Sequence, residues 1–306
     1  MAVNVDTKCT GVPDKMSHGF QTLRRSELMR GAVEPESEEQ RASRSELLDN
    51  LEAAVLSLDQ ATMLQPLVYP QARLVSLTEH GSLGAEKFML LSARLRRLQD
   101  QRKLKKIVLT SSVQNEGKSL VAANLAISLA RGTKQKVLLL EGDLRRPALS
   151  RLFGRGQLKG LSELLYGQES ATRFLLRMDG LALWLLFAGI LRDRPLDLLQ
   201  SPRLSQLLNQ FAECFDWIVI DAPPVLPLAD VDLWAGLADG VLLVVRDNRT
   251  SKKTLQNALD SLKKATLLGL VLNEASALDG GYYDEMPGRT AGKNHHEKRA
   301  ENGAAS

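Results

Sequence analysis

The chain has 306 residues, of which 44% are hydrophobic and 25% charged, and its formal net charge at pH 7 is +4. This composition is typical of a globular protein with one sizeable α/β domain and extensions, and so weak a positive charge does not require a nucleic-acid partner. The two cysteines show no metal-ligand spacing, and no apolar run reaches the ~20 residues of a membrane span, so a cytosolic protein is expected.

The first part of the chain, residues 1–79, is predicted to be an extension of the main domain. It begins with a polar, acidic stretch that is typical of disorder. Ser43 and Glu46 then form a capping box that opens an amphipathic helix. We expect the apolar face of this helix to pack on the domain or to pair weakly with itself, and docking to a partner is the alternative. Pro66 and Pro70 mark a linker.

A second helix is predicted from about Gly84 to Gln99, because apolar residues recur there at helical spacing. Its end and the segment that follows it are rich in basic residues, between Arg94 and Lys106. These cations could attract the anionic inner leaflet of a membrane or an acidic partner. We favour the simpler interpretation, a solvated helix end whose cations suit the helix dipole.

The segment 106–120 has the pattern of a phosphate-binding loop. An apolar strand is followed by a small polar loop, by Gly117-Lys118-Ser119 and by residues with helical periodicity. In such a loop, backbone N–H groups at a helix N-terminus and the lysine bind phosphates, and the serine hydroxyl binds Mg²⁺. Ser112 replaces the usual first glycine, and Asn115 is a residue type that tolerates positive φ. The pattern alone leaves open an accidental Gly-Lys-Ser at a helix start.

Two acids follow the next predicted strand, 135–140. Glu141 and Asp143 are two residues apart, and on a strand such residues point to the same side. Beside a phosphate-binding loop, that side would face Mg²⁺ and the γ-phosphate. The alternative is a turn whose acids cap the next helix, with Arg145 and Arg146 as surface charges. We favour the functional interpretation because the motif directly follows the strand after the predicted P-loop helix.

A further acidic position is predicted at the end of a central strand. After a short helix at 160–167, a strand at 181–187 and an amphipathic helix at 204–215, the apolar run from Trp217 ends in Asp221. A continuous apolar run is typical of a parallel central strand, and ligands bind at the carboxyl ends of such strands. This pattern predicts that Asp221 holds Mg²⁺ directly or through water, as a Walker B residue does.

The rest of the pattern completes an α/β fold. Strands at 241–245 and 268–272 enclose a helix at 251–265, so strands and helices alternate along the chain. The alternation predicts a doubly wound, mainly parallel sheet of the P-loop NTPase class. We expect this domain to occupy residues 80–276 and the polar tail, residues 277–306, to be disordered.

Several motifs occur together in this order: TSxxxxEGKS followed by an NLA stretch, then EGDLR, GLSELLYG, IVIDAPP and finally LVLN. With these motifs the chain resembles the bacterial tyrosine kinases of capsule and exopolysaccharide synthesis, which are related to the MinD/ParA ATPases. The resemblance covers about residues 72–276.

The resemblance implies an ATP- and Mg²⁺-dependent protein-tyrosine autokinase, of the non-specific protein-tyrosine kinase class, that regulates capsule and exopolysaccharide biosynthesis and export. Tyr282 and Tyr283 would accept the phosphate. The implied partner is a separate, membrane-embedded chain-length regulator, which would recruit the protein to the inner face of the plasma membrane. Self-association is a further expectation.

The resemblance and the residue chemistry together define three sets of site residues. The catalytic set is Lys118, Glu141, Asp143, Arg145 and Asp221, in which Arg145 would stabilise transition-state charge. The metal-binding set is Ser119, Glu141, Asp143 and Asp221. The nucleotide-binding set is Ser112, Val113, Gln114, Asn115, Glu116, Gly117, Lys118, Ser119, Leu120 and Asn273, of which Asn273 would contact adenine.

The sequence also departs from the family pattern. Glu141 replaces the first aspartate of the acidic pair, and Met89 and Ser92 stand where the family has arginines for ring assembly, which argues against that assembly. Val113 replaces the extra P-loop lysine of the MinD/ParA ATPases. Two alternatives therefore remain: an ATP-binding regulatory subunit of the polysaccharide machinery with weak or no kinase activity, and a MinD/ParA-like ATPase.

Overall fold

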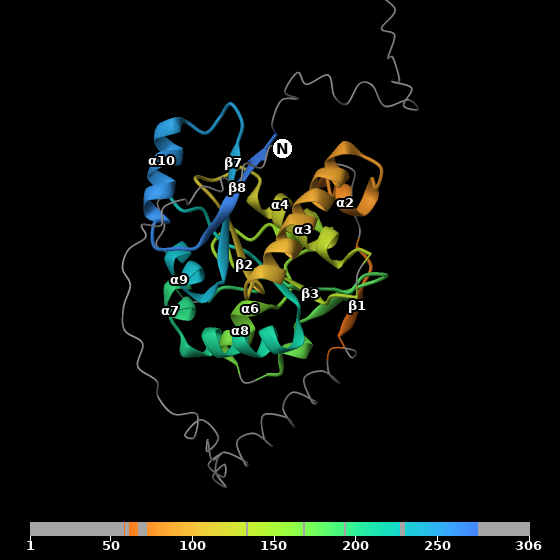
Figure 1. Ribbon diagram of the computed structural model, residues 1–306. Helices are drawn as coiled ribbons and strands as arrows, with labels where there is room; N and C mark the ends of the chain where they lie inside the picture. Colours follow the sequence, from red (N-terminus) through yellow and green to blue (C-terminus); the bar gives the residue numbers. More distant parts are fainter. Residues whose placement is uncertain are drawn as a thin grey trace, which may run out of the picture.

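The computed structural model describes residues 58, 61–66, 72–132, 134–167, 169–192, 194–226 and 230–274. Over these residues the chain forms an eight-stranded sheet with helices on both faces (Figure 1). Of the helix predicted to begin at Ser43, only Leu58 is described, and it is buried in the core. The tail with Tyr282 and Tyr283 lies outside the described residues.

The sheet is mainly parallel and doubly wound, as predicted. Its strands are β1 Thr62–Leu64, β2 Lys106–Ser111, β3 Val137–Glu141, β4 Leu176–Met178, β5 Leu183–Leu186, β6 Trp217–Asp221, β7 Gly240–Arg246 and β8 Leu267–Asn273. They lie side by side in the order β1-β4-β5-β3-β6-β2-β7-β8. The strands from β5 to β8 in this order are parallel neighbours. Strand β4 is antiparallel to β5, and β1 pairs in parallel with β4.

The predicted helices at 84–99, 160–167, 204–215 and 251–265 correspond to α3, α6, α8 and α10, and the helical periodicity after Gly117-Lys118-Ser119 corresponds to α4. The helices of the described residues are α2 Val75–Thr78, α3 Leu83–Gln101, α4 Lys118–Ala130, α5 Leu149–Leu152, α6 Leu161–Tyr166, α7 Pro195–Leu199, α8 Pro202–Cys214, α9 Asp230–Leu237 and α10 Lys252–Ser261. A 3₁₀ helix covers Ala171–Arg173. The sequence did not predict α2, α5, α7, α9, β1 or β4.

The central strands are buried on both faces, and alternate residues belong to different cores. In β2, Ile107 and Leu109 pack with the residues of α3 and α4, whereas Val108 packs with those of α6, α7, α8 and α9. Because helices cover both faces, both sets of side chains must be apolar. This double coverage explains the continuous apolar runs from which the strands were predicted.

The folded part of the chain begins before residue 80. Strand β1 pairs with β4, and Leu64 and Leu74 are buried in the core beneath α3 and α4. Helix α2 contacts α4, where the backbone N–H of Ser76 donates a hydrogen bond of 2.9 Å to Asn124 Oδ1. Part of the stretch predicted as an extension therefore belongs to the sheet and its covering layer.

Two residues of the basic run between Arg94 and Lys106 contribute to the fold. The Arg96 guanidinium donates to the carbonyl oxygen of Leu129 at the end of α4, at 2.8 Å. Lys105 Nζ donates to the carbonyl oxygen of Ala212 at 2.6 Å. The last turn of α3 holds no basic residue, so the expected match to the helix dipole is not found, and these two cations act instead through hydrogen bonds to other elements. Among the helices of the described residues, none is both long and apolar enough to cross a membrane.

Candidate functional site

The fold brings distant parts of the sequence together at one edge of the sheet. Strands β2, β3, β6 and β8 all end at this edge, because they are parallel. The P-loop follows β2, while Glu141, Asp221 and Asn273 are the last residues of β3, β6 and β8. In open α/β sheets this carboxyl edge is where ligands bind.

The loop between β2 and α4 is held in shape by its own polar groups. Asn115 and Gly117 have positive φ angles of 64° and 88°, so the prediction for Asn115 is confirmed. The buried Glu116 carboxylate accepts a hydrogen bond of 3.0 Å from the N–H of Val113 and another from the hydroxyl of Thr250. No side chain caps the first turn of α4, so its N–H groups and the positive end of its dipole are available to an anion.

Asn273 closes the far side of this loop. Its Nδ2 donates a hydrogen bond of 3.0 Å to the carbonyl oxygen of Glu116. A Cβ atom at position 117 would lie 2.1 Å from the same nitrogen, so Gly117 is required for this contact as well as for its φ angle. Asn273 therefore lies beside the loop in which the nucleotide is expected.

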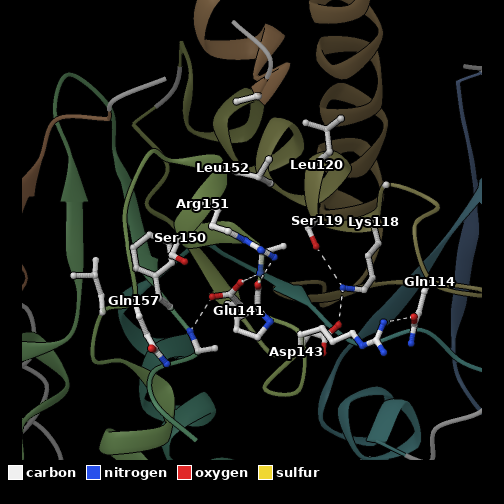
Figure 2. Close-up of a pocket in the computed structure, with 18 of the residues that line it drawn as sticks. Gln114, Lys118, Ser119, Leu120, Glu141, Asp143, Ser150, Arg151, Leu152 and Gln157 are labelled. Atoms are coloured by element: carbon white, nitrogen blue, oxygen red, sulfur yellow. Dashed lines mark hydrogen bonds and ion pairs between the residues drawn. The ribbon is translucent and has the colours of Figure 1, made fainter. Parts of the chain in front are cut away.

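Lys118 lies between the carboxylates of Asp143 and Asp221, and Figure 2 shows its contacts with Asp143 and Ser119. Its Nζ is 2.9 Å from Asp143 Oδ2, 3.3 Å from Asp221 Oδ1 and 3.3 Å from Ser119 Oγ. Burial lowers the pKa of Lys118, but the charges of Asp221 and Asp143 and their hydrogen bonds outweigh it, so the pKa is raised. Lys118 is therefore a fixed cation at the first turn of α4.

Asp221 retains an oxygen that can bind a cation. Its side chain is fully buried, and Oδ2 has no hydrogen-bond partner among the described residues. Burial raises the pKa of Asp221 and the charge of Asp143 adds to this effect, which together outweigh the lowering effects of Lys118 and of the Ser119 hydroxyl. A free carboxylate oxygen beside the Ser119 hydroxyl suits Mg²⁺, which prefers oxygen ligands.

These two residues do not form a complete metal cage. Among the described residues, no group of three His, Cys, Asp or Glu side chains could hold a metal ion by itself. Mg²⁺ in nucleotide sites is usually bound by one or two protein groups, phosphate oxygens and water. Ser119 and Asp221 fit this kind of site.

Glu141 is not part of the cluster around Lys118. Its Oε1 accepts hydrogen bonds from the N–H groups of Ala148 at 2.5 Å and Leu149 at 2.6 Å, and its Oε2 accepts one from Ala188 at 3.0 Å. Burial raises the pKa of Glu141 to about 7, although these bonds lower it. The residue thus holds the start of α5 and the end of β5 together.

Glu141 and Asp143, which the strand pattern predicts to point to the same side, both line the pocket beside Lys118 but make different contacts. Strand β3 ends at Glu141, and the chain turns at Gly142, so the alternation of a strand no longer applies to Asp143. Glu141 corresponds to the alternative interpretation, an acid that caps the next helix. Asp143 corresponds to the functional one, because it contacts Lys118 and also accepts the N–H of Arg146 at 3.0 Å.

Arg145 lies away from the Lys118 cluster. Its Nε donates to Asp230 Oδ2 at 2.8 Å, and Asp230 is buried at the start of α9. Arg145 is not among the described residues that line the pocket beside Lys118. The ion pair of Arg145 with Asp230 connects the acidic turn to α9. This position does not support the predicted contact of Arg145 with a transferred phosphoryl group.

A pocket of about 1150 Å³ opens beside Lys118 and extends along α5 (Figure 2). Of the predicted nucleotide-binding residues, those that line it are Gln114, Asn115, Gly117, Lys118, Ser119 and Leu120, and those that do not are Ser112, Val113, Glu116 and Asn273. Glu141 and Asp143 line it as well. The nucleotide loop and the acidic turn therefore share one cavity.

Arg146 and Arg151 line the pocket, although no sequence pattern had placed either of them in the site. Both are exposed. Arg146 donates to the side-chain oxygen of Gln114, and Arg151 donates to the carbonyl oxygen of Pro147 at 3.2 Å. Their place on the pocket wall depends on α5, a short helix without a sequence signal, so only their proximity to the acidic motif could have suggested a role.

Several known proteins are similar to this chain in sequence or in fold. The tyrosine-protein kinase YwqD of Bacillus subtilis strain 168 is 31% identical over 205 residues, which cover 66% of this chain and 86% of YwqD. The succinoglycan biosynthesis transport protein ExoP of Rhizobium meliloti strain 1021 is 33% identical over 187 residues, which cover 60% of this chain but only 24% of ExoP. The crystal structure of the chimerical protein CapA2B2 superposes with a TM-score of 0.63 and 25% identity, and the match covers 73% of this chain and 97% of that one. No protein-family model matches the chain.

Proposed function

The chain belongs to the bacterial tyrosine-protein kinase family of capsule and exopolysaccharide biosynthesis, and from this premise we propose that it phosphorylates tyrosines of its own tail, Tyr282 and Tyr283. In this proposal the phosphate donor is ATP, bound with Mg²⁺. The observation that carries the proposal is the buried cluster of Lys118, Asp143 and Asp221 at the N-terminus of α4. It combines a cation for phosphates with carboxylates for a metal ion and for a hydroxyl group.

Phosphoryl transfer depends mainly on positioning and on charge stabilisation. Lys118 and the N–H groups of the P-loop would bind phosphate oxygens. Ser119 and Asp221 would hold Mg²⁺, which supplies charge neutralisation on the transferred group. Asp143, which lines the same pocket, would orient or deprotonate the tyrosine hydroxyl. Glu141 would act only by positioning the turn that carries Asp143.

We also propose that the protein works beside a separate membrane-embedded chain-length regulator at the inner face of the plasma membrane. The support is that ExoP, a much longer protein named for succinoglycan biosynthesis transport, contains a region similar to this chain. Recovery of the full chain in the membrane fraction only when such a regulator is co-expressed would support this partner. Equal recovery without the regulator would contradict it.

A second candidate is an ATP-binding regulatory subunit with weak or no kinase activity. The observation that favours it is the engagement of Glu141 with three backbone N–H groups, which leaves two carboxylates rather than three beside Lys118. Such a subunit would bind ATP and change its affinity for a partner without labelling tyrosine.

Incubation of the full chain with ATP labelled at the γ-phosphate separates the two candidates. The kinase proposal expects labelled phosphotyrosine in the wild type and none in Lys118→Met or in the double variant Tyr282→Phe/Tyr283→Phe. Binding of ATP by the double variant should equal that of the wild type. If the wild type binds ATP but forms no phosphotyrosine, even with a membrane partner present, the kinase proposal is rejected and the regulatory one is favoured.

A further inference from the structure

The pocket beside Lys118 has an outer wall to which the proposed mechanism assigns no role. We infer that Arg146 and Arg151 on this wall bind the acidic residues that follow the tail tyrosines, Asp284 and Glu285. This inference rests on the proposed kinase function and deepens it, because it names an acidic tyrosine segment, residues 279–285 of this chain, as the acceptor that the pocket recognises.

The two arginines are available for an acidic ligand. Both are exposed, both line the pocket, and neither forms an ion pair with a residue that the structure describes. Their hydrogen bonds to Gln114 and to the carbonyl oxygen of Pro147 involve uncharged acceptors. A guanidinium group carries five N–H donors, so each arginine keeps donors for a carboxylate.

The inner wall of the same pocket has the opposite character. Glu141 and Asp143 line it, and Asp221 lies behind it, where it shares the single ammonium group of Lys118 with Asp143. Glu141 accepts hydrogen bonds from backbone N–H groups and pairs with no cation among the described residues. An acidic peptide would be repelled from these carboxylates and attracted to the arginines. This distribution of charge would keep the acidic residues outside and let the preceding tyrosine point inward.

The tail has the complementary sequence. Residues 279–285 read Asp-Gly-Gly-Tyr-Tyr-Asp-Glu, so Asp284 and Glu285 directly follow Tyr283. Two adjacent carboxylates face two guanidinium groups in the inferred complex, and arginine–carboxylate pairs are charge-assisted and often bidentate. Charge complementarity is therefore matched in sign and in number.

The described part of the chain ends close to the pocket. Asn273, at the end of β8, contacts the P-loop next to Gly117, which lines the pocket. Tyr282 follows Glu274 by eight residues, and an extended chain of that length spans about 26 Å at ~3.3 Å per residue. The acceptor segment is thus tethered beside the loop that would hold the donor.

Binding of a fluorescein-labelled peptide of residues 277–287, followed by fluorescence anisotropy, tests the inference without relying on catalysis. The full chain is used in the presence of ADP and Mg²⁺. It carries the substitutions Tyr282→Phe, Tyr283→Phe, Asp284→Asn and Glu285→Gln, so that its own tail does not compete with the peptide. We expect Arg151→Glu to weaken peptide binding by about tenfold, since it converts attraction into repulsion. A peptide with Asp284→Lys and Glu285→Lys should reverse the order of affinities.

Arg102→Glu is the matched control. Arg102 is exposed, lies at the end of α3 outside the pocket and forms no ion pair among the described residues. Its variant should bind both peptides as the parent chain does. Unchanged affinity for ADP in both variants would exclude a general loss of folding.

The outcomes distinguish this inference from the proposed kinase function. Equal peptide binding by the parent chain, Arg151→Glu and Arg102→Glu would overturn the inference, whatever the kinase activity. If the peptide binds with the expected charge dependence but ATP does not lead to its phosphorylation, the docking site stands and the kinase proposal fails.

Discussion

Replacing Glu141 with glutamine tests the balance between burial and hydrogen bonding at the acidic turn. The side chain of Glu141 is only 1% exposed, and burial raises its pKa from 4.5 to about 7. Because the folded-state pKa lies above the unfolded one, the folded protein binds more protons at pH values between the two. The stabilisation is therefore complete below about pH 4.5 and is lost as the pH rises through 7.

The expected magnitude follows from this pKa difference. A change from 4.5 to about 7 corresponds to about 3 kcal/mol, at ~1.4 kcal/mol per pKa unit. Glutamine keeps an oxygen for Ala148 and Leu149 but turns an NH₂ group toward the N–H of Ala188, a cost of about 1–3 kcal/mol that does not vary with pH. The free energy of unfolding of the wild type, relative to Glu141→Gln, should thus fall by about 2–3 kcal/mol between pH 5 and pH 8.

Urea unfolding without nucleotide or metal ions measures this difference. The fluorescence of the buried Trp184, Trp217 and Trp234 reports the loss of the core. Asp260→Asn serves as a control, because Asp260 is exposed on α10 and its pKa is lowered by hydrogen bonds from Lys263 and Gln256. A relative stability that stays constant or rises from pH 5 to pH 8 would refute the claim that burial outweighs the three N–H bonds of Glu141.

Three other substitutions probe the loop, the core and the metal site. Gly117→Ala should weaken ATP binding by about tenfold in calorimetry, because it strains a positive φ and presses a Cβ atom against Asn273; unchanged affinity would contradict this. Gly160→Ala would put a Cβ atom 1.9 Å from the carbonyl oxygen of Phe187, so Tm should fall by about 5–10 °C in calorimetric scans, and an unchanged Tm would disprove the close contact. Removal of Mg²⁺ with EDTA should weaken ATP binding to the wild type but change that of Asp221→Asn by less than about twofold; an equal loss in both would exclude Asp221 as a ligand.

Elements with a continuous apolar pattern could be predicted from the sequence. The run from Trp217 to Asp221 is strand β6, and the helix after Gly117 is α4, each at its predicted place. Both elements are buried, so the periodicity of the side chains records their surroundings directly.

Short elements could not be predicted, because they are stabilised by contacts with other parts of the chain and not by their own sequence pattern. Strand β4, Leu176–Met178, has three residues, and it exists by pairing with β5 on one side and with β1 on the other. Helix α5, Leu149–Leu152, has its start held by the Glu141 carboxylate. Neither three nor four residues contain enough periodicity to reveal such an element.

For the site, the sequence could not predict the direction in which a side chain points at the end of a strand. The sequence correctly indicated that Lys118, Asp143 and Asp221 gather at one sheet edge. The sequence could not show that the Glu141 carboxylate accepts hydrogen bonds from the N–H groups of two loops. The positions of Ala148 and Ala188 in these loops depend on the whole fold. The chemistry of a residue type predicted its possible roles, and its neighbours selected one of them.

The contact between the last two strands and the P-loop limits how far the chain can be shortened. Asn273 donates to the carbonyl oxygen of Glu116, Arg246 donates to that of Asn115 at 3.3 Å, and Thr250 donates to the Glu116 carboxylate. Strand β8 is the outermost strand on its side of the sheet, which would make it an obvious strand to trim in a search for a minimal nucleotide-binding fragment. A premature stop codon before Asn273 would nevertheless remove the hydrogen bond from this residue to the P-loop. Such a fragment would bind ATP more weakly, although most of its sheet would remain.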